Sequence, residues 1–229
     1  MSPTKAALAL LFLCTVSALA CGRRDATPRA PERETSGPPP SAPSAPSPPS
    51  AAVPTAPDSF LVALTTSRGP VSVVVHRSWA PRGADRFYAL VHGGFYDGAR
   101  FFRVVRGFVV QFGLPADPQL GRAWSSQLLP DDPVRHPNRR GTVTFASAGP
   151  NTRTTQLFIN LADNVRLDGL GFSPIGQVAE GLGIVDSLYG QYGERPSQDS
   201  IRLQGDPYLT RAYPNLDRIR AATIVREWR

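Results

Sequence analysis

The sequence predicts a mainly β fold: a closed antiparallel barrel of about eight strands, capped by two helices and preceded by a disordered tether. From residue 58 onward, short runs rich in β-branched and aromatic residues alternate with turn-forming clusters of glycine, proline and asparagine. Two stretches there repeat apolar residues at helical spacing. Residues 22–57, in contrast, hold 11 of the 24 prolines, and such a segment cannot bury enough apolar surface to fold.

The eight expected strands are short and are separated by turns or longer loops. They cover residues 60–66, 71–75, 101–105, 108–112, 142–145, 156–160, 176–179 and 219–228. One helix is expected from Pro81 to about Gly93, and a second over residues 182–189, each followed by glycine. Residues 114–140 are expected to form a long irregular loop, in which the pair Asp131-Asp132 is exposed and has no chemical role.

The N-terminus has the parts of a signal peptide over residues 1–20. Lys5 is followed by a short apolar core and then by small residues, and the run is too short for a stable transmembrane helix. The sequence Ala-Leu-Ala-Cys that ends at Cys21 resembles a bacterial lipobox, in which the cysteine becomes the lipidated N-terminus. Ordinary signal cleavage beside an incidental cysteine is the alternative.

The expected organisation is therefore a signal peptide (1–20), a lipidated Cys21 with a disordered linker rich in proline, alanine and serine (21–57), and a folded domain (58–229). The linker is expected to be an extended tether that holds the domain away from a membrane. The protein is expected to be exported and anchored through Cys21, facing the periplasm. Gly22 in place of an aspartate favours the outer membrane.

Arginine carries almost all the positive charge, since the net charge is +7 and Lys5 is the only lysine. A basic protein can bind nucleic acid or anionic membranes, but these arginines are scattered, so we expect no nucleic-acid partner. Cys14 and Cys21 both precede the domain, which therefore has no cysteine for a disulfide or a metal. The three histidines lack metal-ligand spacing. We expect no metal, no cofactor and a monomer.

Residues 101–113 read Phe-Phe-Arg-Val-Val-Arg-Gly-Phe-Val-Val-Gln-Phe-Gly and place Arg103 and Gln111 within two otherwise apolar strands. Burying either side chain unpaired is costly. Arg103 therefore either serves a site or points to solvent from a half-exposed strand. In simple alternation Gln111 lies opposite Phe108, so both can serve one site only if the chain bends or bulges near Val109.

This stretch and residues 141–160 resemble two motifs of the cyclophilin family of peptidyl-prolyl cis/trans isomerases. The first matches Phe-His-Arg, a phenylalanine five residues after the arginine, and Gln-x-Gly, with Phe102 in place of the usual histidine. The second matches Ala-x-Ala-Gly-Pro-Asn-Thr and Gln-Phe-Phe-Ile, with Leu157 in place of one phenylalanine. The resemblance runs from about Phe60 to near the C-terminus. It implies a barrel fold, isomerisation of X–Pro bonds, and proline-containing polypeptides as partners.

The resemblance also implies roles for the residues that match the motifs. Arg103 matches the arginine that donates to the prolyl nitrogen in the twisted transition state. Phe108 matches a wall of the proline pocket, and Gln111 matches the glutamine that orients the substrate carbonyl and the arginine. The remaining expected substrate-binding residues are Val109, Ala146, Ser147, Gln156, Phe158, Leu167 and Phe172.

The chain departs from the family pattern at the rim of this site. Ser147 stands where the family usually has asparagine, and Arg166 stands where it has tryptophan. The family's common histidine is missing near Phe172, which we expect to fill that wall instead. The expectation is retained activity with an altered substrate range and weaker binding of the family's cyclic-peptide drug.

We therefore expect an isomerase that assists the folding of exported proteins at the cell envelope. The alternative is a related module that binds proline-containing segments with little turnover. A hydrolase has little support, because the chain lacks a Gly-x-Ser-x-Gly elbow. Phosphate-binding and dinucleotide-binding motifs are missing as well.

Overall fold

The computed structural model describes residues 54–229, so the expected signal peptide, Cys21 and most of the expected linker lie outside the described residues. The described chain forms one antiparallel sheet in the order β3-β4-β6-β5-β7-β2-β1-β8. The strands are β1 (Ser59–Thr66), β2 (Pro70–His76), β3 (Arg103–Val105), β4 (Val109–Phe112), β5 (Thr142–Phe145), β6 (Leu157–Asn160), β7 (Pro174–Glu180) and β8 (Ile219–Trp228). All eight expected strands are thus present, and the mainly β class is confirmed.

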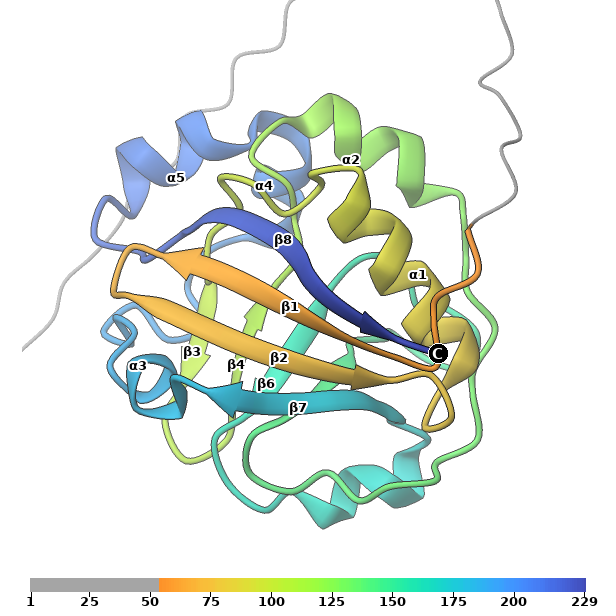
Figure 1. Ribbon diagram of the computed structural model, residues 1–229. Coiled ribbons are helices and arrows are strands. Elements are labelled where there is room, and N and C mark those ends of the chain that lie inside the picture. Colours follow the sequence, from red (N-terminus) through yellow and green to blue (C-terminus); the bar gives the residue numbers. More distant parts are fainter. Residues whose placement is uncertain (1–53) are drawn as a thin grey trace, which may run out of the picture. The chain divides into compact units, whose positions relative to one another are not determined.

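The sheet is an open half-barrel, so the expectation of a closed barrel is wrong. β3 and β8 are its two end strands, and β3 pairs only with β4. Between the two ends, the described residues contain an isolated bridge, Arg100 with Arg218, and no ladder. The reason is the length of β3, whose three residues are followed at once by the turn into β4. Figure 1 shows β1, β2 and β7 in front of β3, β4 and β6.

The expected helices at 81–93 and 182–189 are both present, but residues 54–229 contain five α-helices and one 3-10 helix in all. They are α1 (Pro81–His92), α2 (Pro118–Ser125), α3 (Leu182–Asp186), α4 (Gln198–Gln204), α5 (Asp206–Ala212) and η1 (Val165–Leu170). α1 lies near one end of the sheet, whereas α2, α4 and α5 lie together along its rim (Figure 1). α2, α4 and α5 are only seven or eight residues long, which is about two helical turns. Their starts are marked by capping residues, such as Asp117 before α2 and Ser197 before α4.

The main hydrophobic core fills the space between the curved sheet and α1. Alternate residues of β1 and β2 point inward, as the period of two requires. Phe60 and Tyr96 are fully buried on either side of Phe87, which α1 contributes to the core. This core holds β4 and β6 in register, and those strands carry the inner wall of the candidate site.

A second hydrophobic cluster lies outside the sheet and fastens α4 and α5 to the domain. Its buried members are Phe102, Leu114, Ile201, Leu209 and Leu216. Phe102, which stands where the family resemblance led us to expect histidine, is 1% exposed within this cluster. A phenylalanine there therefore provides the apolar surface against which the α4–α5 segment packs.

Asp132 is buried, so the prediction that it is exposed is wrong. Its carboxylate accepts hydrogen bonds from the backbone N–H groups of Arg82 (3.1 Å) and Gly83 (2.9 Å), in the first turn of α1. It also pairs with the buried Arg153 over 3.0 Å. A carboxylate from a distant loop thus satisfies N–H groups that the helix itself leaves unpaired.

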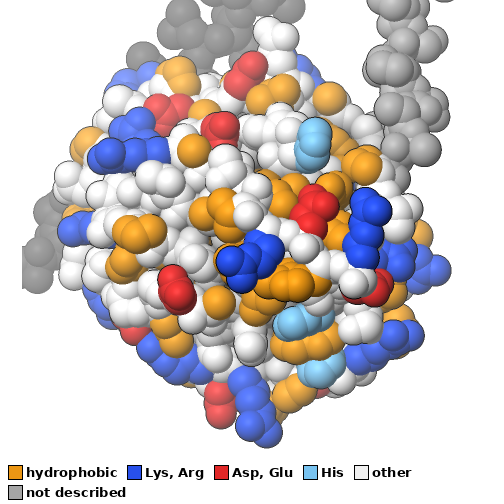
Figure 2. All heavy atoms as spheres, viewed as in Figure 1, with side chains coloured by type: hydrophobic (Ala, Val, Ile, Leu, Met, Phe, Trp, Pro, Cys, Tyr) orange, Lys and Arg blue, Asp and Glu red, His pale blue; other side chains and the backbone are white. Residues whose placement is uncertain are grey.

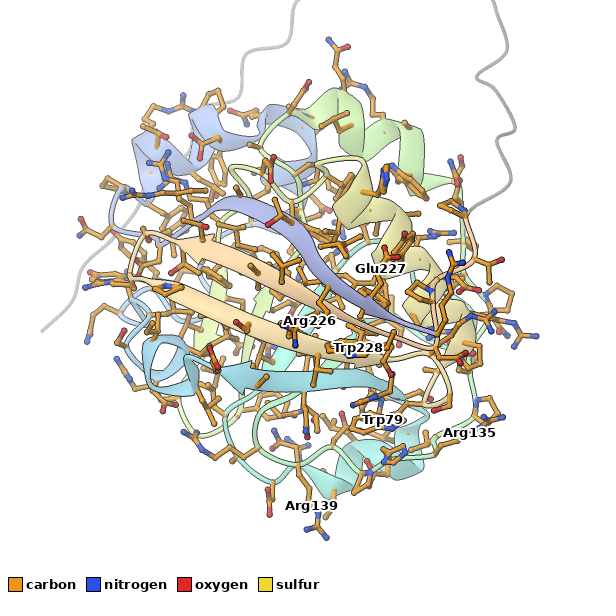
Figure 3. The ribbon with its side chains drawn as sticks, in the orientation of Figure 1. Trp79, Arg135, Arg139, Arg226, Glu227 and Trp228 are labelled. Carbon is orange, nitrogen blue, oxygen red and sulfur yellow. The ribbon has the colours of Figure 1, made fainter. Side chains whose placement is uncertain are left out.

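The outer face of the sheet is mixed in character. Figure 2 shows hydrophobic side chains there interspersed with charged and uncharged polar ones. At the C-terminal end of β8, Arg226 lies 5.7 Å from the ring centroid of Trp228 (Figure 3). Trp79 stacks between the rings of His76 and His136.

None of the helices within residues 54–229 has the length and apolar character needed to cross a bilayer.

Candidate active site

The β3–β4 hairpin shows how Phe108 and Gln111 can face the same site, although simple alternation along one strand would place them on opposite faces. Residues 106–108 form a tight turn, in which Gly107 has φ of 71° and the N–H of Phe108 donates to the Val105 carbonyl over 3.0 Å. A left-handed φ favours glycine, which lacks a Cβ. Phe108 therefore belongs to the turn and not to β4. The strand begins at Val109, so Phe108 and Gln111 both reach the same cavity without the expected bend or bulge inside the strand.

Arg103 and Gln111 are directly opposite each other in the β3–β4 pair. The guanidinium Nη1 of Arg103 donates to Oε1 of Gln111 over 3.3 Å, and Gln111 Nε2 donates to Oε1 of Gln156 over 2.9 Å. The Arg103 side chain is 24% exposed and lines a cavity, which favours a place in a site over an arginine that only faces solvent. This polar row gives both amides partners inside an apolar surrounding.

The cavity beside Arg103 has a volume of about 300 Å³. Val109, Phe158 and Leu167 form its buried apolar base. Phe172 packs edge-to-face on Phe158, with ring centroids 5.7 Å apart. Nine of the ten expected site residues line this cavity, whose full lining is Arg103, Phe108, Val109, Gln111, Ala146, Ser147, Phe158, Leu167, Phe172 and Gln198.

Gln156, the tenth expected residue, lines the adjoining cavity of about 330 Å³. That cavity shares Gln111, Ala146, Ser147 and Gln198 with the first, so the two form one continuous groove. Its other wall is mostly polar and comes from residues that were not among the expected site residues, although Ala148 and Thr152 belong to the second motif. The residues of this wall are Ser125, Ala148, Thr152, Thr154, Gln198 and Arg202.

The segment that carries Gln156 is held from below by two buried side chains. Arg86 Nη1 donates to the Thr154 carbonyl over 3.2 Å, and the Tyr96 hydroxyl donates to the Thr155 carbonyl over 3.0 Å. Burial lowers the pKa of Arg86 and raises the pKa of Tyr96 well above its ordinary value. The Tyr96 hydroxyl therefore stays protonated and remains a donor. Arg86 thus supports the groove from beneath.

Charged residues surround the mouth of the groove, and sequence reasoning missed two of them, Glu194 and Arg202. The Cζ atom of Arg166 lies 4.9 Å from the ring centroid of Phe108, and that of Arg103 lies 5.6 Å from it. Glu194 pairs with Arg103, and Arg202 pairs with Asp199. The sequence pointed to Arg166, because it stands where the family resemblance leads us to expect tryptophan. No sequence motif pointed to Glu194 or Arg202, because they reach the groove only through the packing of α4 and α5.

The arrangement holds a fixed cation beside an apolar slot of the size of a small ring, with amide side chains between them. Such a site can bind an uncharged ring and donate hydrogen bonds to it, without nucleophile or base. Within residues 54–229, no group of three or more histidine, cysteine, aspartate or glutamate side chains is placed to hold a metal ion.

Three comparisons with known proteins agree on the family. The family model described as cyclophilin type peptidyl-prolyl cis-trans isomerase matches residues 61–204. Peptidyl-prolyl cis-trans isomerase-like 1 of Homo sapiens is 33% identical over 172 residues, covering 72% of this chain and 99% of that protein. A peptidyl-prolyl cis-trans isomerase of Arabidopsis thaliana is 33% identical over 149 residues, covering 62% of this chain and 91% of the relative.

The fold has solved counterparts. A crystal structure of a cyclophilin type peptidyl-prolyl cis-trans isomerase from Cryptosporidium parvum superposes with a TM-score of 0.57 at 21% identity. It covers 74% of this chain and 99% of that one. A second structure of the same protein, determined in the presence of the dipeptide Ala-Pro, has a TM-score of 0.56 at 22% identity and covers 73% of this chain and 99% of that one. The chain described here belongs to the cyclophilin-type peptidyl-prolyl cis-trans isomerase family.

Proposed function

We propose that this isomerase acts on X–Pro bonds of exported proteins at the cell envelope, and that Arg103 stabilises the twisted amide in the transition state. The observation that carries the proposal is the position of the Arg103 guanidinium. It is fixed by Gln111 at the edge of the apolar cavity based on Val109, Phe158 and Leu167.

The chemistry needs no covalent step. Resonance gives the peptide bond a rotation barrier of about 18–20 kcal/mol, and rotation removes that resonance. The prolyl nitrogen then becomes pyramidal and regains a lone pair, to which a guanidinium can donate a hydrogen bond. Because this bond forms only when the amide is twisted, it lowers the barrier without tightening ground-state binding. Arginine suits the role because it stays charged and its donors are rigidly arranged.

The groove suggests how a peptide is held. The proline ring enters the apolar cavity, with Phe108 and Phe172 at its partly exposed rim. Gln111 orients the substrate carbonyl and Arg103, while the backbone at Ala146 and Ser147 pairs with the residue before proline. Residues further toward the substrate's N-terminus extend into the polar cavity beside Gln156. The Cryptosporidium parvum structure determined in the presence of Ala-Pro is consistent with recognition of such a unit.

The envelope location rests on the N-terminal sequence. We propose that residues 1–20 direct export and that Cys21 is lipidated, with the following proline-rich segment as a spacer. A folding helper tethered in this way meets polypeptides that have just crossed the membrane. Metabolic labelling with a palmitate analogue tests the anchor: wild type should be labelled and Cys21→Ala should not. Equal labelling of both proteins would exclude lipidation at this cysteine.

The catalytic proposal is tested with Arg103→Ala. We expect turnover of a proline peptide in a protease-coupled assay to fall at least 100-fold, while circular dichroism and the unfolding temperature stay close to wild type. Arg139→Ala is the matched control, because it removes an exposed arginine outside the groove. If Arg103→Ala turns over peptide as fast as wild type, the assignment is wrong.

A binding module with little turnover is the second candidate, and one observation favours it. The Arg103 guanidinium already has a carboxylate partner in Glu194, and part of its donor capacity is therefore occupied. Measuring peptide affinity beside turnover separates the two functions. A binding module would hold the peptide with turnover no faster than the uncatalysed rate.

A further inference from the structure

The loop that precedes α4 brings a carboxylate to the guanidinium of Arg103. Nε of Arg103 donates to Oε1 of Glu194 over 2.6 Å, and Nη2 pairs with the same oxygen. We propose that Glu194 is a positioning residue for isomerisation: it holds the Nε–Nη2 edge of Arg103, so that Nη1 stays directed toward Gln111 and the proline cavity. This inference rests on the proposed function of Arg103.

The loop that carries Glu194 is itself held in place. The Gly193 carbonyl accepts from the N–H of Val104 over 3.3 Å, on the side of β3 that no strand covers. A turn from Gly190 to Gly193 is closed by a 3.0 Å backbone hydrogen bond. Tyr192 packs against the second hydrophobic cluster, whose members include Phe102. Glu194 thus sits on a supported segment, as a group that fixes another side chain must.

Without Glu194, the described residues hold the Arg103 guanidinium by a single side-chain hydrogen bond, the 3.3 Å contact with Gln111. A long arginine side chain has substantial rotamer freedom. A small misplacement of a catalytic group can cost a large factor in rate. The contact with Glu194 should therefore affect the rate of the chemical step more than the affinity for the peptide.

The carboxylate also has an opposing effect, because it offsets part of the positive charge that Arg103 presents to the substrate. Exposure decides which effect is larger. The Glu194 side chain is 63% exposed, so water and salt screen its charge strongly. The orientation that the hydrogen bonds to Glu194 impose on the Arg103 guanidinium is not screened in this way. Removing Glu194 should therefore slow the reaction, although it leaves a more positive site.

The test compares Glu194→Ala with Glu194→Gln in the full-length protein, using a proline peptide and separating kcat from KM. Glutamine keeps an oxygen acceptor and loses the charge, whereas alanine loses both. We expect kcat to fall about tenfold in Glu194→Ala with KM within twofold of wild type, and glutamine to restore kcat to within threefold. Asp186→Asn is the matched control and should leave both constants unchanged, because it breaks an exposed pair with Arg140.

A second readout follows the arginine directly. The Nε–H resonance of Arg103 should move and exchange faster with water in Glu194→Ala, but not in Asp186→Asn. Wild-type or higher kcat in Glu194→Ala would overturn the proposal even if Arg103→Ala is inactive, so the two ideas can fail separately. A loss that glutamine does not restore and that accompanies a lower unfolding temperature would also overturn it, because the role would then be structural.

Discussion

Arg103 and Gln111 occupy paired positions on β3 and β4, and their side chains are joined by a 3.3 Å hydrogen bond beside the apolar cavity that we propose holds proline. The pairing is a consequence of the short turn between the strands, which leaves Phe108 outside β4. A register shift of one residue would turn Gln111 to the other face of the sheet. The hairpin therefore sets the geometry of the site.

The first prediction concerns Gln111. Its replacement by alanine should reduce kcat/KM about tenfold, because the guanidinium loses one anchor and Gln156 loses its hydrogen-bond partner. Tenfold corresponds to about 1.4 kcal/mol of transition-state stabilisation. The protease-coupled assay measures it, with Gln177→Ala, an exposed glutamine on β7, as the control. Unchanged kcat/KM in Gln111→Ala would show that the Arg103–Gln111 bond is not used.

The second prediction concerns Arg202, which lines the polar cavity next to the proline cavity. Peptides with glutamate two residues before proline should be turned over about two- to fivefold faster than peptides with lysine, an effect kept small by solvent screening. Arg202→Glu should reverse the preference. Arg211→Glu, which makes the same charge change on α5, should leave it intact, and about 0.5 M salt should weaken it. A preference unaffected by Arg202→Glu would contradict this role.

The third prediction concerns stability. Asp132→Ala should lower the free energy of unfolding by about 3 kcal/mol, because it leaves the buried Arg153 without its buried partner and exposes unpaired N–H groups in α1. Urea denaturation measures the change. Asp199→Asn should have almost no effect, because Asp199 forms an exposed pair within α4. Similar losses in both variants would refute the special role of Asp132.

The fourth prediction concerns pH. Burial, with a further contribution from the charge of His136, lowers the pKa of His76 below its ordinary value of 6.5. The unfolded chain then binds a proton more readily than the folded chain, so this group reduces stability as the pH falls below about 6.5. The only side-chain hydrogen-bond partner of His76 in the described chain is the Ser59 hydroxyl.

Replacing His76 with glutamine should therefore make the loss of stability between about pH 7 and pH 5 smaller. The free energy of unfolding, measured by urea at both pH values, reports the difference from wild type. His92→Gln, at an exposed position at the end of α1, is the control. A pH dependence as steep in His76→Gln as in wild type would contradict the prediction.

Features with a local signature could be predicted from the sequence. Alternating β-branched and aromatic runs located all eight strands, and Arg103, Gln111 and Phe158 stood out as parts of long motifs. The prediction of a closed barrel was wrong because closure depends on whether β3 pairs with β8. That relation involves segments far apart in the chain.

Features that depend on tertiary packing could not be predicted in this way. α4 and α5 have seven residues each and pack through Ile201 and Leu209 into the cluster around Phe102. Glu194 and Arg202 reach the groove through that packing. Asp132 looked like a loop residue because its partners, Arg153 and the start of α1, are distant in sequence.

The two hydrophobic clusters support different parts of the groove. The larger one holds the strands that bear Gln111 and Phe158, whereas the smaller one, through Phe102, holds the segment with Glu194 and Arg202. Substitutions at the exposed positions of α4 and α5 should therefore leave the sheet in place, whereas Asp206 of α5 is excepted because it pairs with the buried Arg100. Exposed residues on this segment can thus differ, and alter which peptides enter the polar cavity, without any change to the side chains on β3 and β4 that line the apolar one.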